Sequence, residues 1–379
     1  MGEYRDCRRG SRLWALALWG LLSLLLAGCG GGTPSPEGET LALPDTLKLT
    51  AELPEEYPGQ AKTYTANWLE VEEDRAVQTL FRGEGGEWLQ WAQGRQLLAK
   101  GEDISESLLI YGGEIKGGLI YSYRHHADEG GGPVVKNEPG YPQMTTQQYG
   151  YDDMQDYAEE GDLSFKSRAE ASKEIEELLY ACGFPPLALQ RSYVLDAETM
   201  NEHQALYNRV MREDSEEFRE YEYTEEDEGY LFHFRQVLDG IPFANLIWSK
   251  GTRDEGTETV LYSKYGRNGS LTINAWGVYE IGKPVSEDAV ISPEEAIEAY
   301  AAEYRKALHS VETEIFGVEL NYIVVYNAAE MYAKPAWILS SRYKEEYEEA
   351  GETLEYYEYE VTAVSAVTGA LIQGETDLR

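Results

Sequence analysis

The chain has 379 residues, of which 69 are acidic and 32 are basic, so its formal net charge is −37 at pH 7. A chain this acidic repels nucleic-acid phosphates and anionic lipid head groups, which excludes the usual electrostatic attraction to either partner. Its surface suits cationic partners or divalent ions, although most acidic surfaces are simply solvated. The length allows two or three domains, and 29 tyrosines and 8 tryptophans favour β-structure.

The first 28 residues have the three parts of a secretory signal. Four arginines precede an apolar run from Leu13 to Leu26, and the small residues Ala27 and Gly28 then lead to Cys29. A basic region, an apolar core and a small-residue cleavage site predict export. A transmembrane helix is the alternative, but the apolar run is shorter than the roughly 20 residues that a membrane span needs.

The residues around Cys29 resemble the lipobox of bacterial lipoproteins, in which Leu-(Ala/Ser)-(Gly/Ala) precedes the modified cysteine. The resemblance implies cleavage before Cys29, acylation of Cys29 with chains such as palmitate, and anchoring to the outer face of the cell membrane. Two or three acyl chains anchor stably, because each buried methylene contributes about 0.8 kcal/mol. We therefore expect a lipoprotein signal peptide at residues 1–28 and a flexible linker at residues 29–45.

The other cysteines agree with an exported chain. Cys7 lies in the predicted signal, so Cys182 is the one thiol left after acylation and no intrachain disulfide is expected. This usage is consistent with a Gram-positive surface. Because Cys182 ends an apolar stretch next to Gly183, we interpret it as a small buried hydrophobic residue and not as a nucleophile.

The part of the chain before residue 164 is predicted to contain one small domain and a linker. Residues 46–124 are expected to form a β-rich N-terminal domain, in which glycines interrupt the strands. Residues 125–163 lose the apolar pattern and are rich in glycine, proline and acidic side chains, so we expect a loop or linker there. The expected elements of the domain are a helix at residues 72–81 and strands at residues 63–71, 107–111 and 118–123.

The remaining residues show one order of elements twice, a helix followed by strands. In residues 164–285 a helix is expected at 164–182, a polar helix within 201–228, and strands at 187–195, 230–238, 241–248, 257–265 and 269–279. In residues 286–379 a helix begins at Ser292, because Ser292, Pro293 and Glu295 form a capping box with proline at the first helical position. Strands are expected at residues 318–326, 336–347, 355–364 and 370–373.

This repetition predicts an α+β fold. Each unit would be a helix packed on an antiparallel β-meander, the unit would occur in tandem, and a smaller β-rich region would precede the two. Within residues 336–347 the period is two, which places Trp337, Leu339, Ser341 and Tyr343 on one face of a strand.

Four segments of the last part resemble PepSY-type domains. The same order of motifs occurs in the YycH/YycI-type extracytoplasmic regulators of a Gram-positive sensor kinase, and with the lipobox the whole chain resembles lipoproteins of clostridia and their relatives. The resemblance implies a PepSY-like domain at residues 286–379 and an inhibitory, chaperone-like or regulatory binding role outside the cell. It supplies no catalytic residues. The segments are residues 292–297, 320–326, 334–339 and 364–372.

Motifs for catalysis or metal binding are weak. His125 and His126, near Asp128 and Glu129, lack the i, i+4 spacing of a zinc enzyme. The acidic stretch at residues 152–162 lacks the pattern of a calcium-binding loop. The sequence has no nucleophile elbow, Ser-x-x-Lys motif or phosphate-binding loop. We therefore expect no enzymatic activity, no cofactor and no specific metal site.

One cluster of tyrosines is a candidate binding site. It lies on a predicted hairpin, where tyrosines most often pack against cross-strand neighbours. The alternative is an exposed face that binds a peptide, a cationic protein or a wall sugar, or an edge that accepts a partner strand. The candidate binding residues are Tyr343, Tyr347, Tyr357 and Tyr359.

The favoured hypothesis is a non-enzymatic, lipid-anchored protein on the outside of the cell membrane. It would bind or regulate another envelope protein, such as a sensor, a peptidase or a wall enzyme, and would bind no nucleic acid. An alternative is a solute- or glycan-binding lipoprotein, which predicts alternating βαβ units in two lobes. A third hypothesis, an envelope hydrolase, predicts a pocket with convergent titratable groups.

Overall fold

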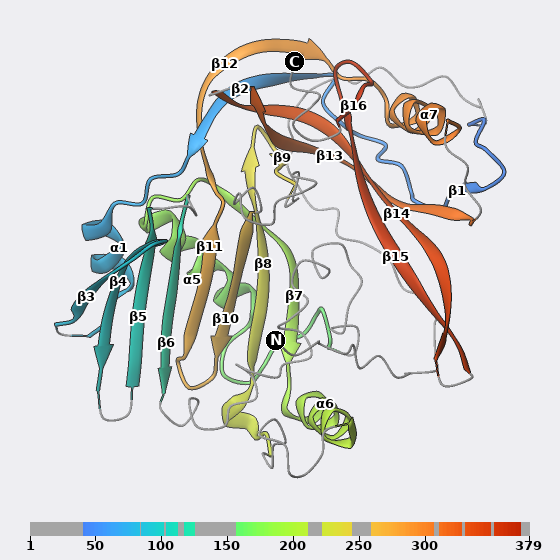
Figure 1. Ribbon diagram of the computed structural model, residues 1–379. Coiled ribbons are helices and arrows are strands. Elements are labelled where there is room, and N and C mark those ends of the chain that lie inside the picture. The colour runs from blue at the N-terminus through green and yellow to red at the C-terminus, as the bar shows by residue number, and fades with distance from the viewer. Residues whose placement is uncertain are drawn as a thin grey trace.

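Two large β-sheets, each with helices packed against it, form the protein, as the computed structural model in Figure 1 shows. Most of the described chain is in strands. The structure describes residues 41–83, 85–101, 104–112, 117–125, 157–210, 222–244, 259–306, 311–327, 330–349 and 352–372.

The first sheet has nine strands, all paired antiparallel. Its centre is the pairing of β6 with β11, which joins residues about 150 positions apart in the sequence. A short strand, β9, pairs with β8 after the Asp239–Gly240 turn. In spatial order the strands are β3 (Glu87–Trp91), β4 (Gly94–Lys100), β5 (Ile104–Tyr111), β6 (Leu119–His125), β11 (Leu271–Trp276), β10 (Val260–Gly266), β8 (Gly229–Leu238) and β7 (Leu187–Leu195), with β9 (Ile241–Pro242) beside β8.

Two helices, α1 (Glu73–Leu80) and α5 (Arg168–Ala181), contact each other and cover one face of this sheet. The α5 helix begins at Ser167, whose side chain and that of Glu170 form a capping box. Side chains from alternate strand positions meet the helices, so one face supplies the core. A further helix, α6 (Ala197–Val210), packs through Met200 in a separate buried cluster with residues of β7, β8 and β10, and a 3-10 turn, η1 (Glu225–Asp227), precedes β8.

The second sheet has seven strands and is organised around β14, which pairs with three neighbours. Residues 330–343 of β14 pair with β13, residues 331–333 pair with β2, and residues 336–349 pair with β15. The helix α7 (Pro293–Tyr304) lies against β14 and β15. The strands are β1 (Leu47–Leu49), parallel to β13 (Thr313–Asn327), then β14 (Glu330–Glu349), β15 (Glu352–Ser365) and β16 (Leu371–Ile372), with β2 (Gln60–Trp68) joining β14 to β12 (Tyr279–Ala289).

The turn after β8 connects the sheets. Phe243 forms a parallel bridge with Tyr322 of β13, and their rings lie 5.4 Å apart. The side chain of Gln236 on β8 donates to the carbonyl of Tyr279 at 2.9 Å and accepts from its N–H at 3.2 Å. Because Gln236 is 1% exposed, both bonds are shielded from water and hold the start of β12 against the first sheet.

The predicted tandem of helix-plus-meander domains is wrong. The α5 helix packs with α1 on a sheet that contains strands from residues 87–125, and α7 covers a sheet completed by β1, β2 and β12. The prediction relied on the order of elements, which carries no information about the partner of each strand. Each sheet takes strands from more than one of the predicted domain ranges.

Several local predictions are confirmed. The helix α7 begins after Ser292, with Pro293 at its first position and both hydrogen bonds of the capping box to Glu295. The period of two in β14 is confirmed because Trp337 and Leu339 pack in one buried cluster and Ala336 and Ile338 in another. The predicted signal peptide, Cys29 and nearly all of the predicted linker lie outside the described residues.

Candidate functional site: the β14–β15 hairpin

The hairpin of β14 and β15 extends beyond the rest of its sheet. The ladder between β13 and β14 ends at the pair Thr313–Tyr343. Residues 344–349 of β14 then pair with β15 alone among the described strands. Figure 1 shows the two long strands leaving the sheet side by side. In a two-stranded ribbon of this kind the outer backbone edge of each strand has no strand partner among the described strands.

The outer edge of β15 has no second strand along most of its length. β16 reaches only Ala363 and Val364. Within the part of the chain that the structure describes, residues 358–362 therefore pair with β14 on one side only. We call residues 358–362 the open edge. Alternate N–H and C=O groups of such an edge point outward and can accept another strand.

The register divides the four candidate tyrosines between two faces. Tyr343 lies opposite Glu358, whereas Tyr357 lies opposite Lys344 and Tyr359 opposite Arg342. Residues directly opposite each other share a face, and neighbours along a strand alternate. Positions 343 and 347 are therefore on one face and positions 357 and 359 on the other. The four residues belong to one hairpin, but they do not form one surface.

Arg342 organises the face that contains Tyr357. Its guanidinium donates to Glu314 of β13 at 2.7 Å, and it lies 4.9 Å from the ring centre of Tyr357 and 5.4 Å from that of Phe316. The hydrogen bond from Arg342 holds the pKa of Glu314 below its ordinary value, and a second bond, from Thr50 at 2.7 Å, adds to this. Arg342 thus ties three strands together where the ribbon begins.

Tyr357 is 44% exposed and is among the most exposed large apolar side chains of the described chain. Its ring stacks on a fixed cation, so its position is defined although it faces solvent. An ordered, exposed aromatic side chain next to an open strand edge is typical of binding surfaces. Sequence reasoning identified Tyr357 and the possibility of an edge that accepts a partner strand, but it missed Arg342, because the contacts of Arg342 depend on strand register.

The base of the hairpin is firmly held. Trp337 is fully buried, donates from Nε1 to the carbonyl of Ile291 at 3.0 Å, and meets the ring of Tyr57 edge to face at 5.3 Å. Thr313, opposite Tyr343, accepts a hydrogen bond from Tyr304 of α7 at 3.0 Å. A rigid base of this kind lowers the entropy cost of binding at the projecting part.

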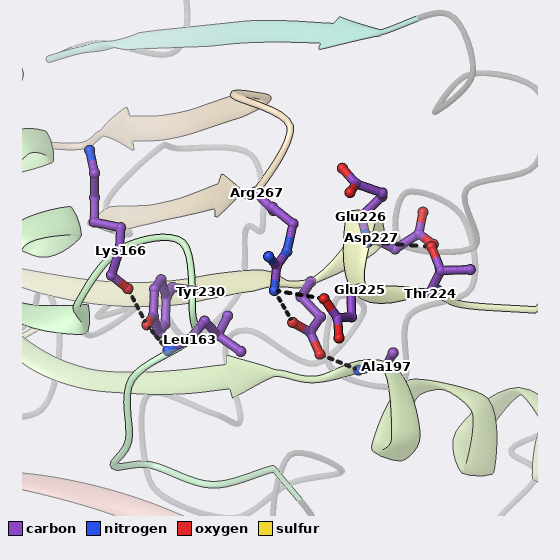
Figure 2. A network of polar contacts seen from close by, with 10 residues as sticks. Leu163, Lys166, Ala197, Thr224, Glu225, Glu226, Asp227, Tyr230 and Arg267 are labelled. Atoms are coloured by element: carbon purple, nitrogen blue, oxygen red, sulfur yellow. Dashed lines mark hydrogen bonds and ion pairs between the residues drawn. The ribbon is translucent and has the colours of Figure 1, made fainter.

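A polar network at one end of the first sheet is the other conspicuous cluster (Figure 2). Arg267 lies 2.7 Å from Glu228 and 3.9 Å from Glu225. Glu228 also accepts from the N–H of Ala197, the first residue of α6, at 3.5 Å. These contacts join the β10–β11 turn to η1 and α6, so we assign the network a structural role.

His125, considered in the sequence as a possible metal ligand, has ordinary surroundings. Nε2 of His125 lies 3.0 Å from the carbonyl oxygen of Asn268, and its ring meets that of Tyr123. His126, Asp128 and Glu129 lie outside the described residues. Within the described ranges no group of three or more His, Cys, Asp or Glu side chains could hold a metal ion.

Cys182 is confirmed as a small buried residue. It is 1% exposed and belongs to the core beneath α5. Burial raises the pKa of the Cys182 thiol to about 11. The thiol is therefore protonated at neutral pH, whereas a nucleophilic cysteine needs a lowered pKa.

Comparisons with known proteins give a fold neighbour and no family. No family model matches the chain, and no curated protein matches it. The chain is similar to a crystal structure of an uncharacterized protein from Eubacterium rectale ATCC 33656, with a TM-score of 0.57 and 13% sequence identity, over 87% of this chain and 91% of that one. At this identity the likeness shows the fold alone. No helix among the described residues has the length and apolar character needed to cross a membrane.

Proposed function

We propose that this protein is a lipoprotein, anchored through Cys29 to the outer face of the cell membrane, that binds another envelope protein by strand addition to β15. The open edge at residues 358–362 carries this proposal. The lipobox-like sequence before Cys29 supports the location. The PepSY-like motifs support a regulatory rather than a catalytic role, by analogy of pattern.

Strand addition fits the geometry better than ligand enclosure. An extended segment of a partner gains main-chain hydrogen bonds along an open edge, and side chains beside the edge select its sequence. A solute-binding lipoprotein would be built from βαβ units with parallel strands. Here the one parallel ladder between described strands is that of β1 with β13. This topology favours the binding protein over the transport alternative.

Crosslinking in the cells that make the protein tests the proposal. A photoreactive residue replaces Tyr359 at the open edge, and a matched control carries the same group at Val285. Val285 is 58% exposed on β12, an edge strand interrupted by Pro284 and by two shifts in register. We expect one envelope protein to be crosslinked reproducibly from position 359 and not from position 285.

The anchor is tested in the same experiment. Cys29→Ala should prevent incorporation of labelled palmitate and release the protein from the membrane fraction, and it should reduce crosslinking at position 359. Equal crosslinking from both positions, or a captured permease with its nucleotide-binding subunit, would reject strand addition at β15. Labelled palmitate in the Cys29→Ala variant would reject the anchor.

A further inference from the structure

We infer, on the basis of the strand addition proposed above, that the partner strand alternates basic and apolar residues. The register of β15 assigns the residues of the open edge to two faces. Glu358, Glu360 and Thr362 occupy one face, and Tyr359 and Val361 occupy the other. A strand added beside them must present its own alternate residues to these two different rows.

We call Glu358 and Glu360 the acidic row. It has no basic residue directly opposite it on β14. The residues directly opposite Glu358 and Glu360 are Tyr343 and Ser341. On the other face the situation differs, because Arg342 lies opposite Glu314 and bonds to it. Glu360 is exposed. Opposite charges on facing positions of neighbouring strands stabilise pairing, so basic residues are favoured in the added strand next to Glu358 and Glu360.

The second row continues an apolar surface. Val361 packs against a buried cluster that contains Ile338 and Ala363. Tyr357 and Tyr359 occupy the same face nearer the tip of the hairpin, opposite Lys344 and Arg342 of β14. Apolar residues of a partner strand would lengthen this surface and bury more of it, which is favourable by about 25 cal/mol per Å².

The acidic row also disfavours pairing of the open edge with a second copy of this chain. Like charges at directly opposed positions destabilise a strand pair. Two copies of this chain paired edge to edge would bring their rows of Glu358 and Glu360 together, whereas a basic strand would place opposite charges there. The observations therefore favour a basic strand of another protein over self-association.

Short capped peptides can test the inference with the full chain in detergent micelles. One peptide alternates lysine and valine, a second alternates serine and valine, and a third has the lysines and valines in separate blocks. We expect the alternating lysine peptide to bind tightest, with an affinity that falls as salt is added. The double variant E358Q/E360Q should bind it about 2- to 30-fold more weakly.

A further peptide separates the inference from the proposed function. It keeps the alternating lysine sequence but carries N-methyl groups on one edge, which removes backbone donors without changing charge. Equal binding of the N-methylated peptide would reject strand addition itself. Equal binding of the serine or the block peptide, or unchanged affinity in E358Q/E360Q with unchanged circular dichroism, would reject the alternating basic partner and leave strand addition standing.

Discussion

The guanidinium of Arg235 on β8 donates two hydrogen bonds to the carboxylate of Glu319 on β13, across the junction of the two sheets. The bonds are 2.7 and 2.8 Å long, and Nη1 of Arg235 also lies 3.1 Å from Oδ1 of Asn321. Burial acts to raise the pKa of Glu319, but the hydrogen bonds and charge of Arg235 outweigh it and hold that pKa below its ordinary value. This side-chain link complements the backbone connection through Phe243.

Replacing Arg235 should weaken the junction. Arg235→Met is expected to lower the free energy of unfolding by about 1–3 kcal/mol, because Oδ1 of the buried Asn321 loses its donor. Arg235→Lys should restore only part of this, since an ammonium cannot make two parallel bonds. Chemical denaturation at neutral pH measures both. The control is Lys48→Met, which breaks an exposed pair with Glu312 and should change stability by less than about 1 kcal/mol; equal losses in the two Met variants would contradict the prediction.

His233 should make stability depend on pH. Its side chain is buried between the rings of Tyr193 and Tyr262, and burial, aided by the charge of Arg191, lowers the pKa of His233 to about 3. An unfolded imidazole binds a proton near pH 6.5, so between pH 6.5 and 3 the unfolded state holds more protons than the folded state. The free energy of unfolding therefore decreases as the pH is lowered through this range.

His233→Phe tests this dependence while preserving an aromatic ring. The wild-type chain should lose about 2–3 kcal/mol more than the variant between pH 6.5 and pH 4.5. Chemical denaturation at these two pH values gives the difference. Parallel pH profiles for the two proteins would show that His233 is not the group responsible.

Glu106 should be essential for the packing of α1 against the first sheet. Its buried carboxylate accepts from the N–H groups of Arg82 and Gly83 and from the hydroxyl of Tyr121, at 2.7, 2.8 and 2.7 Å. Glu106→Gln places an amide donor toward these donors and should cost about 1–3 kcal/mol. Tyr121→Phe should cost about 1 kcal/mol, because it removes one bond. Thermal unfolding compares the two, and a Glu106→Gln protein as stable as wild type would contradict the assignment.

Arg342 should control the local stability of the hairpin. Arg342→Ala removes the bond to Glu314 and the stacking on Tyr357, while Trp337 still holds the base. We expect amide hydrogens of residues 352–357 to exchange about 3- to 10-fold faster, with the global free energy of unfolding nearly unchanged. Hydrogen-exchange mass spectrometry measures this. Uniformly faster exchange throughout the second sheet would instead show that Arg342 supports the whole sheet.

Local signals were sufficient to predict individual elements. The capping box of Ser292 marked the start of α7, and the gap between the strands expected at residues 230–238 and 241–248 is the Asp239–Gly240 turn between β8 and β9. Both signals act within a few residues, because they satisfy backbone groups of the same turn. The strands β3 and β4 were missed. β3 is a mostly exposed edge strand, so it lacks the alternation of buried and exposed residues on which strand prediction depends.

The pairing of strands was not predictable in the same way. Alternation shows which face of β6 is buried, but nothing in residues 119–125 indicates that their partner is residues 271–276. The candidate site shows the same limit. Residue type identified Tyr343 and Tyr357, whereas their separation onto two faces follows from the register of β14 against β15.

The sharing of β14 among three neighbours constrains the order in which the chain can assemble. β1 and β2 are synthesised early, yet their partners β12, β13 and β14 come from the last third of the chain. Pairings over such separations are slow to form, because the intervening chain must first be closed into a loop. A chain interrupted before β12 would thus leave both β1 and β2 without strand partners, so the second sheet cannot be completed until the last third of the chain is available.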